Sequence, residues 1–172
     1  LQEGKGDLEA LTADAEAVVT PSSDIPDLSA SGGTITCNEP EVFLAAQSQA
    51  GQSISWSGPG GFSSDQFSVS VDVPGAYNAQ VTAANGCQND TTVLVGIDTL
   101  APPLSLSGGV LTCSEPELLL APQTDSTAQT YAWQGPGGFS SGDTLVLATL
   151  PGAYQLTITA ANGCRTTAAT TV

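Results

Sequence analysis

The chain has 172 residues, of which 17 are Asp or Glu and only two are Lys or Arg, so its formal net charge is −15. Two cations cannot neutralise a phosphate backbone, and no run approaches the roughly 18 apolar residues of a membrane span, which excludes nucleic-acid binding and membrane insertion. The lack of His removes the usual catalytic base and metal ligand, while 40% hydrophobic residues in regular patterns exclude a disordered chain.

Residues 1–23 are predicted to form an extended segment. Small apolar and mostly polar residues alternate there, a period of two that favours a β-strand, although the good helix formers in the segment make a helix the competing interpretation. The inward face of this strand is predicted to comprise Leu11, Ala13, Ala15, Ala17 and Val19.

The rest of the chain is a tandem repeat at an offset of 76 or 77 residues. Thr36 and Cys37 return as Thr112 and Cys113. Longer matches join residues 56–64 to 133–141, residues 74–77 to 151–154 and residues 83–87 to 160–164. We therefore predict two repeats of about 75 residues each, repeat 1 at residues 24–98 and repeat 2 at residues 99–172.

Each repeat is predicted to contain six or seven short antiparallel strands separated by turns. In repeat 1 the strands are expected at residues 34–37, 42–45, 53–57, 67–71, 77–81 and 87–95. Phe67, Val69 and Val71 are expected to share one inward face. Asn85 and Gly86 stand between two alternating runs and predict a tight hairpin, because both residues tolerate positive φ.

The large aromatic residues are predicted to serve the core. Trp56 and Tyr77, with their counterparts Trp133 and Tyr154, alternate with other apolar side chains on strands. A sugar-stacking platform is the alternative for the two Trp residues. Two further aromatics, Phe62 and Phe139, follow Gly-rich turns, and we expect them to cover one end of each sandwich.

Each repeat resembles an immunoglobulin-like domain, with a Trp in the third strand, a Gly-x-Tyr opening the next-to-last strand and a cysteine near each end. The Pro-Gly-Ala-Tyr and Ala-Ala-Asn-Gly-Cys motifs are similar to those of Ig-like or PKD-like repeats in secreted and surface proteins of Bacteroidetes, including gliding adhesins. The resemblance covers residues 24–172. It implies an all-β fold of two tandem immunoglobulin-like β-sandwiches in a rod, preceded by the extended segment.

The four cysteines are predicted to form one disulfide inside each repeat. Four cysteines allow three connectivities, and the repeat favours Cys37–Cys87 and Cys113–Cys164, each near one pole of its sandwich. Unpaired thiols are one alternative. A metal site is another, disfavoured because the sequence has no His and no Cys-x-x-Cys pair. Disulfides indicate an oxidising compartment, so we expect a secreted or cell-surface protein.

No residue is predicted to be catalytic, and no cofactor or metal is expected. Glu39 and Glu41, like Glu115 and Glu117, flank a proline in a short turn. Solvated charge is their expected role, with weak Ca²⁺ binding as the alternative. A glycosidase needs two carboxylates that face each other across a cleft, which one short turn does not supply.

Four Asp-Ser/Thr pairs resemble the O-glycosylation sequon of Bacteroidetes. The candidate glycosylated residues are Thr91, Thr99, Ser126 and Thr144. The alternative is that Asp followed by Ser or Thr is ordinary turn chemistry.

The linker between the repeats, residues 98–103, ends in paired prolines that favour an extended and semi-rigid connection, so the two sandwiches should form a rod. Residues 18–20 precede Pro26 much as residues 93–95 precede Pro102. Residues 1–20 thus stand where the last strand of a preceding repeat would be. Either the chain is a piece of a longer array, or the segment is a donor strand for a neighbouring copy.

We therefore predict a non-enzymatic extracellular structural protein that polymerises head to tail with copies of itself into a surface filament. The alternative is a spacer, or an adhesive or carbohydrate-binding module, taken from a large secreted surface protein.

Overall fold

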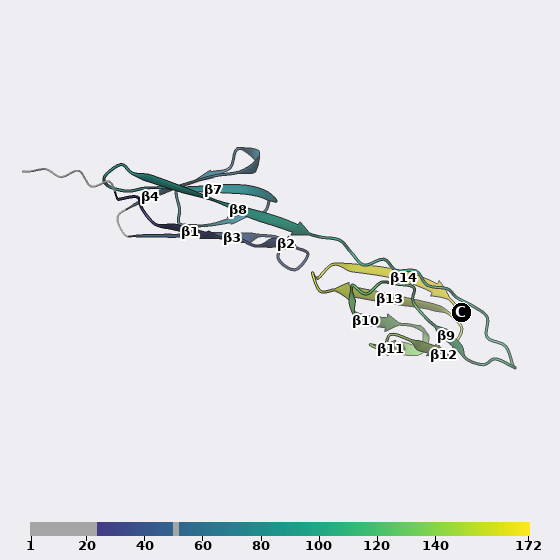
Figure 1. Ribbon diagram of the computed structural model, residues 1–172. Helices are drawn as coiled ribbons and strands as arrows, with labels where there is room; N and C mark the ends of the chain where they lie inside the picture. Colours follow the sequence, from purple (N-terminus) through teal and green to yellow (C-terminus); the bar gives the residue numbers. More distant parts are fainter. Residues whose placement is uncertain (1–23, 50–51) are drawn as a thin grey trace, which may run out of the picture.

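The computed structural model describes residues 24–49 and 52–172. These residues form two β-sandwiches that lie end to end, with β8 (Gln88–Asp98) of the first leading into the linker (Figure 1). Apart from two short 3-10 turns, their regular structure is all strand, which confirms the all-β class. The predicted donor-strand face, Leu11 to Val19, lies outside the described residues.

Repeat 1 consists of a three-stranded sheet of order β1-β3-β6 and a five-stranded sheet of order β2-β8-β7-β4-β5. All neighbours are antiparallel except β2 and β8, which run parallel. The elements besides β8 are β1 (Leu28–Ser31), β2 (Thr34–Thr36), β3 (Val42–Ser48), β4 (Ser53–Ser57), η1 (Pro59–Gly61), β5 (Ser63–Ser64), β6 (Ser68–Val71) and β7 (Gly75–Thr82).

Repeat 2 has the same plan with less regular edges. Its sheets have the orders β11-β10-β13-β14 and β12-β9. The elements are β9 (Leu118–Leu120), β10 (Ala128–Gln134), η2 (Pro136–Gly138), β11 (Ser140–Ser141), β12 (Val146–Ala148), β13 (Ala153–Ala160) and β14 (Arg165–Thr171). In place of β1, an isolated bridge joins Ser105 to Gln123. Residues 110–112, the counterpart of β2, form no strand.

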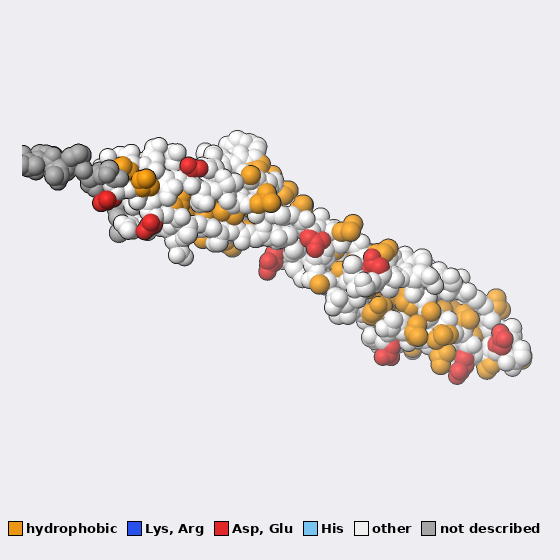
Figure 2. Space-filling model, viewed as in Figure 1, with side chains coloured by type: hydrophobic (Ala, Val, Ile, Leu, Met, Phe, Trp, Pro, Cys, Tyr) orange, Lys and Arg blue, Asp and Glu red, His pale blue; other side chains and the backbone are white. Residues whose placement is uncertain are grey.

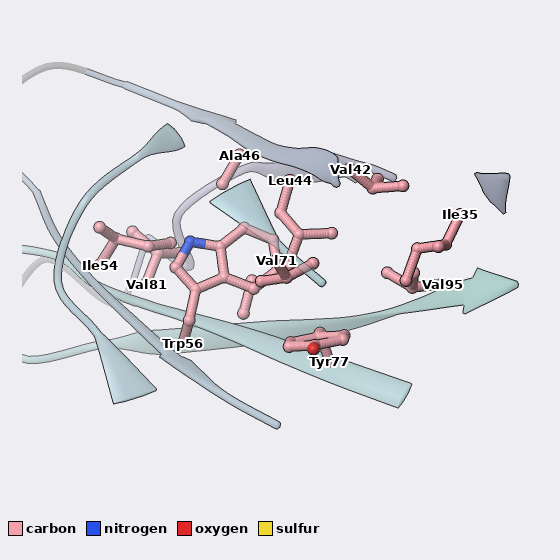
Figure 3. Close-up of a cluster of buried hydrophobic side chains, with 11 residues drawn as sticks. Ile35, Val42, Leu44, Ala46, Ile54, Trp56, Val71, Tyr77, Val81 and Val95 are labelled. Atoms are coloured by element: carbon pink, nitrogen blue, oxygen red, sulfur yellow. The ribbon is translucent and has the colours of Figure 1, made fainter. Parts of the chain in front are cut away.

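The core of each sandwich is built around one Trp and one Tyr. These are Trp56 and Tyr77 in repeat 1 and Trp133 and Tyr154 in repeat 2, each at most 2% exposed. Figure 3 shows Trp56 among aliphatic side chains from both sheets of repeat 1. The indole N–H of Trp56 donates to the carbonyl oxygen of Gln66 (3.0 Å), so the buried ring has no unsatisfied donor.

Two strand boundaries differ from the prediction for repeat 1. The expected inward face of residues 67–71 is incomplete: Val71 is buried and Val69 packs partly against the core, but Phe67 is 38% exposed because β6 begins after it. The last strand is longer than expected and continues to Asp98, where it pairs with β2. This extension carries the chain to the end of the sandwich that faces repeat 2.

Candidate functional site at the junction of the two repeats

A disulfide joins Cys37 of repeat 1 to Cys164 of repeat 2. Their Cα atoms are 5.0 Å apart, and 127 residues separate them in the sequence. Cys37 follows β2, and Cys164 closes the turn between β13 and β14. The two other cysteines are unpaired: Cys87 is half-buried and Cys113 is exposed. The covalent link therefore crosses between the sandwiches rather than stapling each one internally.

This pairing corrects the prediction of one disulfide inside each repeat, Cys37–Cys87 and Cys113–Cys164. Thr36 pairs with Asp98 at one end of β8, whereas Cys87 directly precedes Gln88 at the other end. At about 3.3 Å per residue, these ends of the strand are roughly 33 Å apart. A disulfide needs Cα atoms within about 7 Å of each other. Cys37 and Cys87 thus lie at opposite poles of repeat 1, and Cys37 instead meets the adjacent turn of repeat 2.

Asn162 holds three parts of the junction together. Its side-chain amide donates to Oδ1 of Asp98 (2.9 Å) at the end of β8 and to the carbonyl oxygen of Leu100 (3.0 Å) in the linker. Its Oδ1 accepts the backbone N–H of Cys164 (3.0 Å), and its carbonyl oxygen accepts the backbone N–H of Asn38 (3.2 Å). One side chain therefore connects repeat 1, the linker and the turn that carries the disulfide.

Gly163 lets the two repeats approach closely. Its φ is +80°, in the left-handed region, and a Cβ at this position would overlap the side-chain amide of Asn38. The counterpart in repeat 1, Gly86, has nearly the same φ of +82°, but no described residue lies within 4 Å of a Cβ there. In both turns glycine alone adopts positive φ, whereas the sequence had suggested that Asn85 would share that role. The turn conformation is common to both repeats, and the packing against a neighbour occurs only at the junction.

The linker docks onto repeat 2 through its own carbonyl groups. Pro102 is buried, and its carbonyl oxygen accepts the hydroxyl of Thr166 (2.6 Å). The same arrangement recurs at the front of repeat 1, where the carbonyl oxygen of Pro26 accepts the side-chain amide of Asn89 (2.9 Å). The segment that enters repeat 1 is therefore seated on its sandwich in the same way as the linker is seated on repeat 2.

The acidic turn of repeat 1 borders a groove, and one of its carboxylates is hydrogen-bonded. Glu39 and Glu41 line a groove of about 580 Å³ beside β3, but Glu41 accepts a hydrogen bond from the hydroxyl of Ser70 (2.6 Å). In the part of the chain that the structure describes, no group of three His, Cys, Asp or Glu side chains could hold a metal ion. On the face shown in Figure 2, acidic side chains are scattered along both sandwiches.

The glycosylation candidates lie at different depths. Thr99, Ser126 and Thr144 are exposed, and Thr91 is half-buried on β8. At Asp125, the hydroxyl of Thr127 and then its backbone N–H donate to Oδ1 and lower the pKa of the carboxyl. This hydrogen-bonded turn is the alternative role predicted for the Asp125-Ser126 pair. Its hydrogen bonds come from Thr127 and Ser126 stays exposed, so the turn and glycosylation of Ser126 are compatible.

The Phe residues after the Gly-rich turns face inward. Phe62 packs edge-on against Tyr77 with ring centroids 5.3 Å apart, and Phe139 packs against Tyr154 at 5.6 Å. Both Phe rings are half-buried. With Trp56 and Trp133 in the cores, no flat exposed aromatic platform for a sugar is formed by these four residues.

Sequence reasoning missed the residues that build the junction. Asn162 and Gly163 belong to the repeated Ala-Ala-Asn-Gly-Cys motif, which predicted a hairpin and a family resemblance but no contact between the repeats. Asn38 carried no motif of its own, and Asp98 was noted only as part of the Asp98-Thr99 pair. The available signal was the recurrence of the entire Asn-Gly-Cys sequence, since a hairpin by itself does not require the cysteine.

Among known proteins, no family model and no curated protein matches the sequence. The fold is similar to a solved structure from work on host cell-surface retention of a 1.5-MDa bacterial ice-binding adhesin, with a TM-score of 0.55 and 12% identity over 87% of this chain and 64% of that chain. Weaker similarities include the outer capsid protein Hoc of bacteriophage RB49 (TM-score 0.46, 10% identity, 86% of this chain and 58% of that chain). A three-Ig segment of titin gives a TM-score of 0.46 and 11% identity, over 85% of this chain and 64% of that chain.

The chain thus spans less than two thirds of each of these solved chains. At such low identity the likeness concerns the fold alone, and it supports two tandem immunoglobulin-like β-sandwiches. The narrower resemblance to repeats of Bacteroidetes stays a prediction. Within residues 24–49 and 52–172, the structure contains no apolar helix of membrane-spanning length.

Proposed function

We propose that the chain is a non-enzymatic structural module of an extracellular or cell-surface protein, and that it acts as a subunit of a filament assembled head to tail. The observation that carries this proposal is the junction, where the end of one repeat is shaped to receive the next. A disulfide, the Asn162 amide and the docked linker all act at that one place. A rod with this junction resists bending and separation, which a purely catalytic or ligand-binding protein does not need.

The front of repeat 1 supports the addition of a further unit there. Asn85 donates to the carbonyl oxygen of Asp24 (3.1 Å), and its counterpart Asn162 donates to that of Leu100. Asn89 donates to the carbonyl oxygen of Pro26, and its counterpart Thr166 donates to that of Pro102. The chain that enters repeat 1 therefore follows the path of an inter-repeat linker. Residues 1–20, predicted as a strand from their alternation, are the segment that would pair with a preceding copy.

Assembly from a carboxylate-rich chain requires specific contacts, because a net charge of −15 makes copies repel one another. Main-chain pairing by a donated strand supplies such contacts without any charge complementarity. The same repulsion discourages side-by-side clumping of the assembled rods. A head-to-tail contact that does not close on itself produces a filament.

Negative-stain electron microscopy of the purified full chain tests this function. We expect fibres whose thickness is that of one rod, and we expect deletion of residues 1–20 to abolish them. Two double variants sharpen this test. One replaces Leu11 and Val19 by Asp on the predicted inward face, and the control replaces Thr12 and Thr20 by Asp on the opposite face. Only the inward pair should prevent fibres. Monodisperse monomers of the unmodified chain would contradict the filament.

A spacer within a larger surface protein is the second candidate, because a covalent junction between repeats of one chain equally suits a longer array. In that case the purified chain stays monomeric while remaining a stiff rod in small-angle X-ray scattering. An adhesive, carbohydrate-binding version requires glycan-array binding that Phe62→Ala or Phe139→Ala abolishes. The inward packing of both rings speaks against it.

Glycosylation is a separate part of the proposal. Thr99, Ser126 and Thr144 are accessible to a modifying enzyme, and Thr91 less so. The intact mass of protein isolated from its source should exceed that of the bare chain. Peptide mapping should place the added mass on these residues, and a mass equal to the bare chain would rule the modification out.

A further inference from the structure

The two unpaired cysteines are the counterparts of the two that form the junction. Cys113 corresponds to Cys37 at the offset of 76, and Cys87 corresponds to Cys164 at the offset of 77. Cys87 lies at the turn between β7 and β8, whereas Cys113 lies in the loop ahead of β9, and Figure 1 shows these two places at opposite ends of the molecule. Each end of the rod thus carries one half of the disulfide that its centre contains.

The half-site at Cys113 shares two hydrogen bonds with the loop at Cys37. In the loop of repeat 1, the backbone N–H of Thr36 donates to the carbonyl oxygen of Glu39 (2.8 Å), and Oγ1 of Thr36 accepts the N–H of Glu39 (3.0 Å). In repeat 2, Thr112 and Glu115 make the same two hydrogen bonds, each at 3.0 Å. Both cysteines therefore follow a Thr that makes the same pair of hydrogen bonds, and Cys113 is exposed.

The half-site at Cys87 matches Cys164 in the same way. The backbone N–H of each cysteine is accepted by the Oδ1 of the Asn two residues earlier, Asn85 or Asn162, at 3.0 Å in both repeats. Gly86 and Gly163 have the same left-handed φ to within 2°. The space above Gly163 is filled by Asn38, while the equivalent space above Gly86 holds no described residue.

We propose that Cys113 of one copy and Cys87 of the next copy form a disulfide, so that the junction inside the chain is repeated between chains. This inference rests on the proposed head-to-tail assembly and names its covalent bond. The occupant of each half-site is a second copy of this chain, because the complementary half lies at that copy's opposite end. Ser114, next to Cys113, then takes the place above Gly86 that Asn38 takes above Gly163. Since Ser is smaller than Asn, it needs no more room there than Asn38 needs above Gly163.

The bond forms by thiol–disulfide exchange with a low-molecular-weight disulfide such as oxidised glutathione. The exposed Cys113 thiolate attacks one sulfur of oxidised glutathione, which gives a mixed disulfide and releases one glutathione thiolate. The Cys87 thiolate of the next copy then attacks Sγ of Cys113 and releases the second glutathione. The two protein thiols are thereby oxidised by two electrons, glutathione disulfide is reduced to two thiols, and two protons leave the protein cysteines.

Two single variants of the full chain test the pairing, since each retains the central disulfide and one half-site. Cys87→Ser keeps Cys113, and Cys113→Ser keeps Cys87. Each variant is incubated alone, or in an equimolar mixture, with oxidised and reduced glutathione, and the products are separated on a non-reducing gel. We expect a dimer in the mixture, its loss in either variant alone, and a ladder of longer species from the unmodified chain. Digestion and mass spectrometry should find the peptide that joins Cys113 to Cys87.

Dimers that form as readily from one variant alone as from the mixture would overturn the proposal, because they would reflect random oxidation of exposed thiols. Absence of any cross-link would overturn it as well. A digest that joins Cys37 to Cys87 or Cys113 to Cys164 would do the same. Circular dichroism of each variant, with the Cys37–Cys164 peptide found in its digest, shows that the fold is retained.

Electron microscopy separates failure of this inference from failure of the filament. Fibres that form from the unmodified chain without a Cys113–Cys87 peptide would refute the bond and leave the filament standing. Cross-linked dimers without fibres would support the bond and refute the filament. If both hold, the Cys87→Ser/Cys113→Ser double variant should give fibres that dissociate on dilution, whereas those of the unmodified chain persist until a reductant is added.

Discussion

Breaking the Cys37–Cys164 disulfide should destabilise both sandwiches, although each has its own hydrophobic core. When either sandwich unfolds alone, the bond closes its chain into a loop between the cysteine and the linker. That loop is about 60 residues long in each repeat, and closing it reduces the entropy of the unfolded chain by an amount equivalent to about 4 kcal/mol. Reduction removes this restriction, so each sandwich should lose about 4 kcal/mol of stability.

Hydrogen exchange of the Cys87→Ser/Cys113→Ser double variant measures this effect without competing thiols. The oxidised and reduced forms are compared in the central strands β7 and β13, which report on repeat 1 and repeat 2 separately. Protection should fall by about a thousandfold in both strands, since about 1.4 kcal/mol corresponds to a factor of ten. A variant with Ser at all four cysteine positions is the control and should not respond to the reductant.

A fall confined to one sandwich would refute the reasoning, because the loop argument applies equally to both sides of the bond. Unchanged protection in both sandwiches would show that the bond does not restrict the unfolded chain at all. Peptide mapping of the oxidised double variant must also recover Cys37 joined to Cys164.

The remaining predictions concern the junction and the core of repeat 1. Gly163→Ala and Gly86→Ala impose the same left-handed backbone strain of about 1 kcal/mol. Only Gly163→Ala also displaces Asn38, so it should lower the melting temperature more than Gly86→Ala does. Adding Asn38→Ala should remove this difference, and equal effects of the two Gly variants with Asn38 present would contradict the packing. Burial, and secondarily the charge of Asp72, raise the pKa of Tyr77 above 10.0. The stability that neutral Tyr77 contributes should therefore be complete below pH 10.0 and lost as the pH rises through the raised pKa of the folded state. Asp72→Asn should bring the pKa of Tyr77 closer to 10.0 and so make this alkaline loss of stability smaller in denaturation followed by near-ultraviolet circular dichroism, and an unchanged loss would argue against the Asp72 contribution.

Much of the fold followed from local sequence patterns. Trp56 alternates with Ile54 on a five-residue strand, and both are buried, because side chains two apart on a strand share a face. The turn at Gly86 followed from the need for a residue that tolerates positive φ. The prediction that Phe67 faces inward was wrong, because alternation shows which residues share a face but not the residue at which a strand begins.

The same reasoning predicted only part of the candidate site. The repeat showed that Cys37 and Cys113 are equivalent, and that Cys87 and Cys164 are equivalent. The prediction of pairs inside each repeat was wrong, because equivalence alone does not distinguish partners in the same repeat from partners in adjacent ones. That choice depends on the parallel pairing of β2 with the last residues of β8, which places Cys37 at the pole opposite Cys87. Because this parallel pairing joins segments that are far apart in the sequence, no local turn motif predicts it.

The acidic, β-rich character, the tandem repeat, the core aromatics and the equivalence of the cysteine pairs follow from residue type and short-range periodicity alone. The disulfide between the repeats, and the contact that Asn162 and Gly163 complete, follow from the folded arrangement. Those features depend on which strand ends lie next to each other in space. Because β8 is eleven residues long and its end pairs with β2, Cys37 and Cys87 lie at opposite ends of this strand, too far apart for a disulfide.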